Sequence, residues 1–335
     1  MMLAVLLICE ASALGMARLS CDRIKGSVMN TETVIVLGNG FDLDLGWDTS
    51  YKSFYNKHNG WKMHRTDEDD LFQYIIHKVP GNWFDFERTL HEYALHRSEN
   101  PFPKDNTDKI DRDIQDYNTF KTQLMDFIAE GSKGPVKMDS HAYRLLEAYV
   151  GAKKNKTSDR FFPLKLFSYN YTPLLNVIHQ IDSSVKVGYI PVHGMVEKRN
   201  IIFGFHDDLR IPKEYRPLQK SMDENYVSSD VVRESLQAKT IIFFGLSLGY
   251  IDGVYFKNLF EQISNFTNPQ MINKHIVFIT LNIQSGNYIK NNLLDAGINL
   301  QLLYNSNRLD FIYTDDNQKD KTETIFEGLL SSISK

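Results

Sequence analysis

Polar and glycine residues that can bind a nucleotide or move a proton follow several apolar runs of this sequence. Glycine N–H groups can approach a phosphate closely, amide side chains can orient water, and imidazole accepts protons near neutral pH. The candidates, in chain order, are Gly38, Asn39, Gly40, Phe41 and Asp42 after residues 34–37, Asn170 after 164–169, His193 after 185–192, Gly245 and Ser247 after 240–244, and Asn282 after 275–281. The strand, glycine turn and following helix start predict an anion-binding site, and His193 supplies an imidazole that can accept a proton.

Each candidate has a chemical role and a structural alternative. We predict that Gly38–Gly40 cradles phosphate oxygens, although the same residues also suit a tight turn. Asp42 either aligns a ribose hydroxyl or a water or caps a helix, and Asn170 either orients the ribose or closes a turn. His193 is the predicted general base, with a purely structural histidine as the alternative. Ser247 either binds a phosphate or caps a helix.

The apolar runs predict the strands of a parallel sheet. Val34–Leu37 is short and has no polar alternation, which is typical of a strand buried on both faces. Further strands are predicted at 164–169, 185–192, 201–204, 240–244 and 275–281, and helices at 83–97, 110–128, 140–150 and 229–238, with Thr172 as N-cap of a helix that starts at Pro173. Because ligands bind beyond the carboxyl ends of parallel strands, the candidates are expected along one edge of the sheet.

The predicted fold is α/β, with a Rossmann-like parallel sheet flanked by helices. We expect one domain over residues 30–335, with a mostly helical insertion at about 70–155 that covers the site, recognises a trigger or forms a homo-oligomer face. Translation is expected to start at Met29, so that residues 1–28 are an extension, and residues 1–29 lie outside the predicted domain. Both cysteines, Cys9 and Cys21, lie in that extension. The domain therefore lacks a disulfide framework and a thiolate metal site, which fits a cytoplasmic protein with no metal.

Composition and missing motifs exclude several classes of protein. A net charge of −4 and a pI near 6.2 lack the basic excess of nucleic-acid-binding proteins. No window reaches ~18 apolar residues, so no membrane association is expected. Leu43 replaces the third glycine of a dehydrogenase-type motif, and no second strand ends in an acidic residue about 20 positions later. The phosphate-binding Gly-Lys-Ser/Thr sequence is also missing.

The opening motif resembles that of the AbiH family of bacterial abortive-infection proteins. This motif consists of Gly38-Asn39-Gly40-Phe41-Asp42 followed by Gly46, Thr49, Tyr51 and Phe54. The similarity covers about residues 32–260 and includes Trp83 with Glu87, Asn170-Tyr171-Thr172, His193-Gly194, Gly245-Leu246-Ser247-Leu248-Gly249 and Asp252. The resemblance implies an antiphage effector that answers a phage-derived trigger. It also adds Thr49 and Tyr51 to the predicted ligand-binding residues.

The order of these motifs is similar, more remotely, to that of sirtuin-like NAD-binding domains. This implies NAD as substrate or ligand and hydrolysis of its nicotinamide–ribose bond, with Asn170 orienting ribose or water and His193 accepting the proton. The paired zinc cysteines of sirtuins are missing, which argues against deacylation, and Thr172 replaces the carboxylate that contacts nicotinamide. Two alternatives stay open. One is a non-catalytic nucleotide-sensing module, and the other is a metal-dependent nuclease that uses Asp42, His206, Asp207 and Asp208.

Overall fold

The computed structural model describes most of the chain beyond its N-terminal segment. The described residues are 32–57, 70–71, 74–75, 86–103, 107–154, 164–185, 189–227, 229–265 and 272–334. These residues belong to one compact unit, which begins at Thr31. The predicted extension, residues 1–29, and Trp83 lie outside the described residues.

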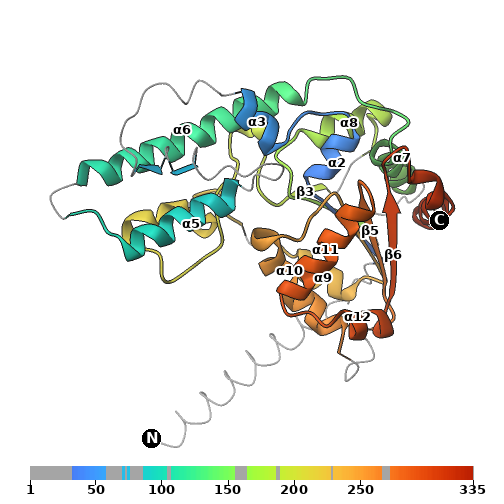
Figure 1. The fold of residues 1–335 in the computed structure, drawn as a ribbon. Helices are drawn as coiled ribbons and strands as arrows, with labels where there is room; N and C mark the ends of the chain where they lie inside the picture. The colour runs from blue at the N-terminus through green and yellow to red at the C-terminus, as the bar shows by residue number, and fades with distance from the viewer. Residues whose placement is uncertain are drawn as a thin grey trace, which may run out of the picture. The chain divides into compact units, whose positions relative to one another are not determined.

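A parallel sheet forms the centre of the described unit (Figure 1). It has six strands in the order β3-β2-β1-β4-β5-β6. The strands are β1 (Thr33–Leu37), β2 (Leu164–Ser168), β3 (Tyr189–Pro191), β4 (Thr240–Phe244), β5 (His275–Thr280) and β6 (Arg308–Tyr313). The predicted Rossmann-like α/β fold is confirmed. Because β1 pairs with both β2 and β4, the strand order reverses beside β1, and such a reversal is where doubly wound sheets bind ligands.

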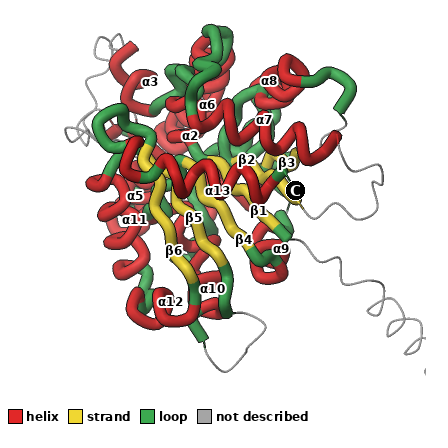
Figure 2. The backbone as a smooth tube through the Cα atoms, turned by 90° about the vertical axis from the view of Figure 1, so that its right-hand side faces the viewer, coloured by secondary structure: helices red, strands yellow, loops and turns green. Residues whose placement is uncertain are grey.

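Helices cover both faces of the sheet (Figure 2). One face packs against α2 (Asn39–Asp44), α7 (His141–Lys154), α8 (Leu174–Ile181) and α13 (Glu323–Ile333), and the other against α9 (Val231–Gln237), α10 (Tyr250–Ile263), α11 (Ile283–Asp295) and α12 (Leu300–Ser306). Ile35 and Leu37 of β1 point into the first layer, whereas Val34 and Val36 point into the second. This double cover explains why the central strands are continuously apolar.

A separate hydrophobic core joins the remaining helices to the long segment after β3. It contains residues of α3 (Tyr51–Lys57), α5 (Phe86–Glu99) and α6 (Thr107–Gly131), together with side chains from residues 196–218. Figure 1 shows α5 and α6 side by side, away from α12. The helix predicted at 110–128 is confirmed as the middle of α6. None of the described helices is long and apolar enough to cross a membrane.

Two local predictions were wrong. Residues 201–204 form no strand, because Ile201 and Phe203 bury their side chains in the core around α5 and α6, and Gly204 turns the backbone at φ +138°. Thr172 does not cap α8, because Pro173 occupies the cap position and the Thr172 hydroxyl is used elsewhere. In addition, β3 is shorter than the predicted 185–192.

Candidate functional site

The glycine turns that follow β1 and β4 pack directly against each other. The Gly40 N–H donates to the Gly245 carbonyl at 3.0 Å, and the Gly38 N–H donates to the Phe244 carbonyl at 2.8 Å. A Cβ atom on Gly40 would lie 2.6 Å from the Gly245 Cα, and one on Gly245, at φ +66°, would lie 2.2 Å from the Phe41 nitrogen. Glycine is required at both positions because the two backbones touch. Two amides of the predicted phosphate cradle thus already bond within the protein.

A buried carboxyl group lies just behind this junction. Asp42, on the first turn of α2, is 1% exposed. The Thr172 hydroxyl donates to its Oδ1 at 3.1 Å, and the Thr49 hydroxyl lies 3.5 Å from its Oδ2. Thr49 also donates to the Asn39 side chain at 2.7 Å, while the Asn170 amide donates to the Gly38 carbonyl at 3.0 Å. Five residues of the predicted site therefore lie together at the carboxyl end of β1, namely Gly38, Asn39, Asp42, Thr49 and Asn170.

The environment of Asp42 changes its protonation. Burial raises the pKa of the Asp42 carboxyl to about 7, and hydrogen bonds from Asn170, Thr172 and Thr49 oppose that rise. No cationic side chain among the described residues contributes to this pKa. Near neutral pH the group therefore exchanges a proton readily, which is the property expected of an acid–base residue.

A buried ion pair forms a second polar cluster. Lys220, 1% exposed, binds Glu87 Oε2 of α5 at 3.0 Å. Glu87 Oε1 accepts from the Tyr171 hydroxyl at 3.3 Å and from the Gly204 N–H at 3.4 Å. Tyr51 also hydrogen-bonds the Tyr171 side chain. The pair thus links α3, α5, the turn after β2 and the segment after β3.

His193 lies beside this ion pair. Its ring packs edge-on against Tyr169 at 4.9 Å and lies 6.2 Å from the Tyr171 ring. Burial lowers the pKa of His193 well below 6.5, and the positive charge of Lys220 lowers it further, while a hydrogen bond with the Tyr169 main chain opposes both. The imidazole is therefore neutral at physiological pH, which is the form that accepts a proton.

The Asn170-Tyr171-Thr172 turn connects the two clusters. Asn170 and Thr172 face Asp42 and its turn, whereas Tyr171 between them faces Glu87 and His193. Alternate residues of this turn therefore contact the Asp42 cluster and the cluster around the Glu87–Lys220 ion pair. A movement of this turn would affect both groups together.

The other predicted ligand residues have structural partners. Phe41 is fully buried and packs edge-on against Phe244 at 5.1 Å. The Ser247 hydroxyl accepts from the Gly249 N–H at 3.3 Å. Asn282 caps α11 by accepting from the Ser285 N–H at 3.0 Å. Each position still lies at the carboxyl edge, and ligand contact there stays a prediction.

The residues of the predicted nuclease site do not assemble into one ligand set. Asp42 lies among threonine hydroxyls, whereas Asp208 pairs with Arg210 at 2.6 Å and with His91 at 3.0 Å. Asp207 hydrogen-bonds Ser221. Within the described ranges no group of three or more His, Cys, Asp or Glu side chains is placed to hold a metal ion.

Comparison with known protein families identifies the chain. The family model described as bacteriophage abortive infection AbiH matches residues 34–273, which include β1 from its second residue, β2 to β4 and both polar clusters. The chain belongs to the AbiH family. It is therefore a phage abortive-infection protein, as the opening motif predicted. No curated protein matches the chain.

Two features of this AbiH protein carried little or no signal in its sequence. Lys220 stands in a polar stretch, and its partner Glu87 lies 133 positions away. His91 lies on α5 and is 1% exposed, although its ring hydrogen-bonds Asp208. Only the helical spacing of Glu87 and His91, which places them on one face of α5, hints at a shared environment.

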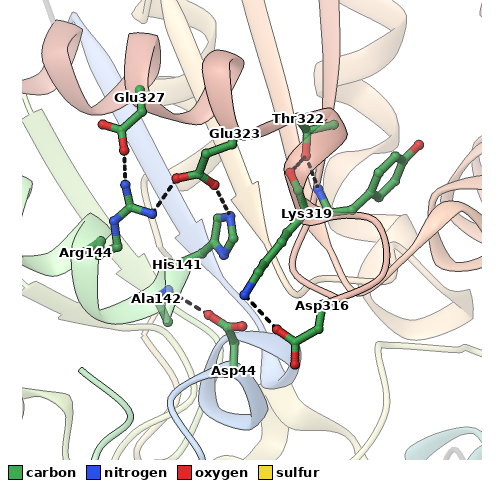
Figure 3. A network of polar contacts seen from close by, with 10 residues as sticks. Asp44, His141, Ala142, Arg144, Asp316, Lys319, Thr322, Glu323 and Glu327 are labelled. Carbon is green, nitrogen blue, oxygen red and sulfur yellow. Dashed lines mark hydrogen bonds and ion pairs between the residues drawn. The ribbon is translucent and has the colours of Figure 1, made fainter. Parts of the chain in front are cut away.

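A separate cavity of about 260 Å³ lies in the AbiH protein between the end of α2, the start of α7 and the segment before α13. Ion pairs dominate its lining (Figure 3). Arg144 binds Glu323 at 2.6 Å and also Glu327, while Lys319 binds Asp316 at 2.8 Å. None of the predicted catalytic residues lines this cavity. We therefore interpret the ion pairs of Arg144 with Glu323 and Glu327 as a structural link that holds α7 against α13, and we call this link the clamp.

Replacing Arg144 with methionine tests the clamp. The Arg144→Met variant should lose about 1 kcal/mol of unfolding free energy, because Arg144 is half-buried and has two carboxylate partners. Urea unfolding measures the change. Lys133→Met, which removes the exposed Lys133–Glu130 pair, should stay within about 0.5 kcal/mol of the unmodified protein. Equal stability of the two variants would contradict the clamp.

Proposed function

We propose that this AbiH protein binds NAD at the reversal of its strand order and hydrolyses the nicotinamide–ribose bond. The observation that supports it is the buried Asp42, whose pKa is raised to about 7, at the carboxyl end of β1. Carboxyl ends beside such a reversal bind nucleotides in other doubly wound sheets. A carboxyl group that titrates near neutrality there has the chemistry of an active-site residue.

Hydrolysis requires a negative group near the ribose. When the C1′–N bond breaks, its electron pair leaves with nicotinamide, and positive charge develops on the ribose. Ionised Asp42 would stabilise that charge, and Asn170 would orient the ribose or the attacking water. Water then adds its oxygen to C1′ and releases a proton. The products are nicotinamide, ADP-ribose and one proton.

The base in this proposal is His193. Its neutral ring accepts the proton that the attacking water releases. Tyr169 and Tyr171 pack around the ring and fix its position. Lys220 keeps the ring deprotonated by its charge, without taking part in the proton transfer.

The purified chain, alone and with phage lysate, should convert NAD to nicotinamide and ADP-ribose. His193→Ala should lower the rate roughly 100-fold, because a positioned base contributes about that much. Chromatography of the products measures the rate. His179→Ala removes an exposed histidine of α8 and serves as the matched control with an unchanged rate. Intact NAD in both conditions, where a known hydrolase consumes it, would refute the proposal.

The burial of the candidate site supports the alternative function, a nucleotide sensor without catalysis. Asp42 and His193 are 1% and 5% exposed, which suits a binding site closed until a trigger acts. Calorimetry separates the two functions. NAD binding without turnover in the presence of phage lysate would establish a sensor in place of a hydrolase.

A further inference from the structure

An exposed tyrosine stands beside the proposed nucleotide site. Tyr250 is the first residue of α10 and follows the glycine turn at the carboxyl end of β4. Its side chain is 46% exposed although it lies among other rings. β4 is one of the two strands that flank the reversal of strand order. A flat, half-exposed aromatic ring at this place can meet a ligand without any rearrangement of the core.

Two side chains of α5 contact the Tyr250 ring. His91 stacks on it with ring centres 5.7 Å apart and an interplanar angle of 25°. The Arg88 guanidinium lies 5.7 Å from the ring centre. Arg88 and His91 are three residues apart on α5, so both approach from the same helix. Side chains of α5 therefore cover part of the Tyr250 ring, and the residue stays 46% exposed.

Two histidine rings contact Tyr250, and they differ in their hydrogen bonds. Asp208 binds His91 Nε2 at 3.0 Å and is itself held by Arg210. His206 lies 5.5 Å from Tyr250, and its buried Nδ1 has no hydrogen-bond partner within the described structure. No bond through Nδ1 thus locks the His206 ring. Burial lowers the pKa of both histidines, so the rings are uncharged and suited to packing on another ring.

We propose that Tyr250, backed by His91, is the stacking platform for the purine base of the bound nucleotide, with Arg88 facing its phosphate. An aromatic ring stacks on the face of any base, and the larger purine ring covers more of it. Guanidinium groups favour phosphate. Arg88 pairs with the partly exposed Glu92 of its own helix at 3.0 Å, and the phosphate would replace that carboxylate as the partner of the guanidinium. The inference rests on the proposed function in one respect, that the ligand is a nucleotide.

Titration with AMP tests the platform directly, because AMP carries the base and phosphate but no nicotinamide. The full chain should bind AMP more tightly than CMP. Tyr250→Ala should weaken AMP binding roughly tenfold or more, whereas Tyr250→Phe should stay within about twofold, since it keeps the ring. Arg88→Gln should weaken binding and reduce its dependence on salt. Tyr304→Ala, which removes a 43% exposed tyrosine of α12, is the matched control and should bind AMP normally.

The outcomes separate this inference from NAD hydrolysis. AMP binding that is lost in Tyr250→Ala supports the platform even where NAD stays intact. Equal AMP affinity in Tyr250→Ala and the unmodified protein overturns the platform, and so does a failure of the unmodified protein to bind AMP. In those two cases the product assay still decides whether NAD is hydrolysed. If NAD is turned over, Tyr250→Ala should raise KM with little change in kcat.

Discussion

Replacing Asp42 with asparagine should abolish NAD turnover and at the same time stabilise the folded protein above pH 7. The ionised carboxyl group is the form that would stabilise positive charge on the ribose, so Asp42→Asn should lower the rate at least about 100-fold. In the unmodified protein the rate should rise as the pH passes through about 7, where Asp42 ionises. His193 is neutral throughout that range and should not limit the rate.

The stabilising effect follows from the sign of the pKa change. The unfolded carboxyl ionises near 3.8, whereas the folded one ionises near 7. Between these values the folded state keeps a proton that the unfolded state has lost, so folding stability falls as the pH rises. Above pH 7 the ionised, buried Asp42 lowers stability by at most about 4 kcal/mol. Asparagine carries no charge and removes this dependence.

Urea unfolding at pH 4 and pH 8 checks the prediction. Asp42→Asn and the unmodified protein should differ little at pH 4, where both side chains are uncharged. At pH 8 the variant should be more stable by about 2 kcal/mol or more, since lost hydrogen bonds offset part of the gain. Asp48→Asn changes an exposed carboxylate in the same region and should alter neither stability nor turnover. A variant that is less stable at pH 8 would show that Asp42 serves the fold instead.

The inner strands of the central sheet were predictable because each contains a short apolar run of sequence. Residues 34–37, 241–244 and 276–279 are continuous apolar runs, and all of them lie in strands buried on both faces. β6 escaped prediction because it is an edge strand in which Arg308 and Asp310 alternate with apolar residues. Residues 201–204 were predicted to form a strand because they are apolar, and they form none. They are as apolar as a strand, but the core beside α5 and α6 takes up their side chains without any ladder of hydrogen bonds.

The candidate site was predictable as a set of positions but not as a set of contacts. Parallel topology alone places Asp42, Asn170 and His193 at one edge. The contact that matters for Asp42 comes from Thr172, 130 positions away, and the sequence favoured a helix cap for that threonine. Lys220 gave no local signal at all. A lysine in a polar stretch is normally solvated, and only the folded chain shows that it is buried against Glu87.

Breaking the buried Glu87–Lys220 ion pair by mutation should lower the free energy of unfolding more than any other change proposed. Lys220→Met leaves the buried Glu87 carboxylate without its cationic partner, and removing one member of a buried pair costs about 3–5 kcal/mol. Glu87→Gln should be costly for the same reason. The double variant, with both charges removed, should lose clearly less than the sum of the single variants, because neither charge is left behind.

Urea unfolding of the four proteins gives the coupling between the two charges. Lys239→Met is the matched control, because Lys239 pairs with Glu32 at 2.9 Å across the chain but is largely exposed, and it should lose less than about 1 kcal/mol. A Lys220→Met variant no less stable than Lys239→Met would show that the pair contributes nothing to folding. The pair joins α5 to the segment that carries Lys220, directly beside His193. Loss of the Lys220 charge should therefore also raise the pKa of His193, and proton NMR of the folded Glu87→Gln/Lys220→Met variant measures that rise.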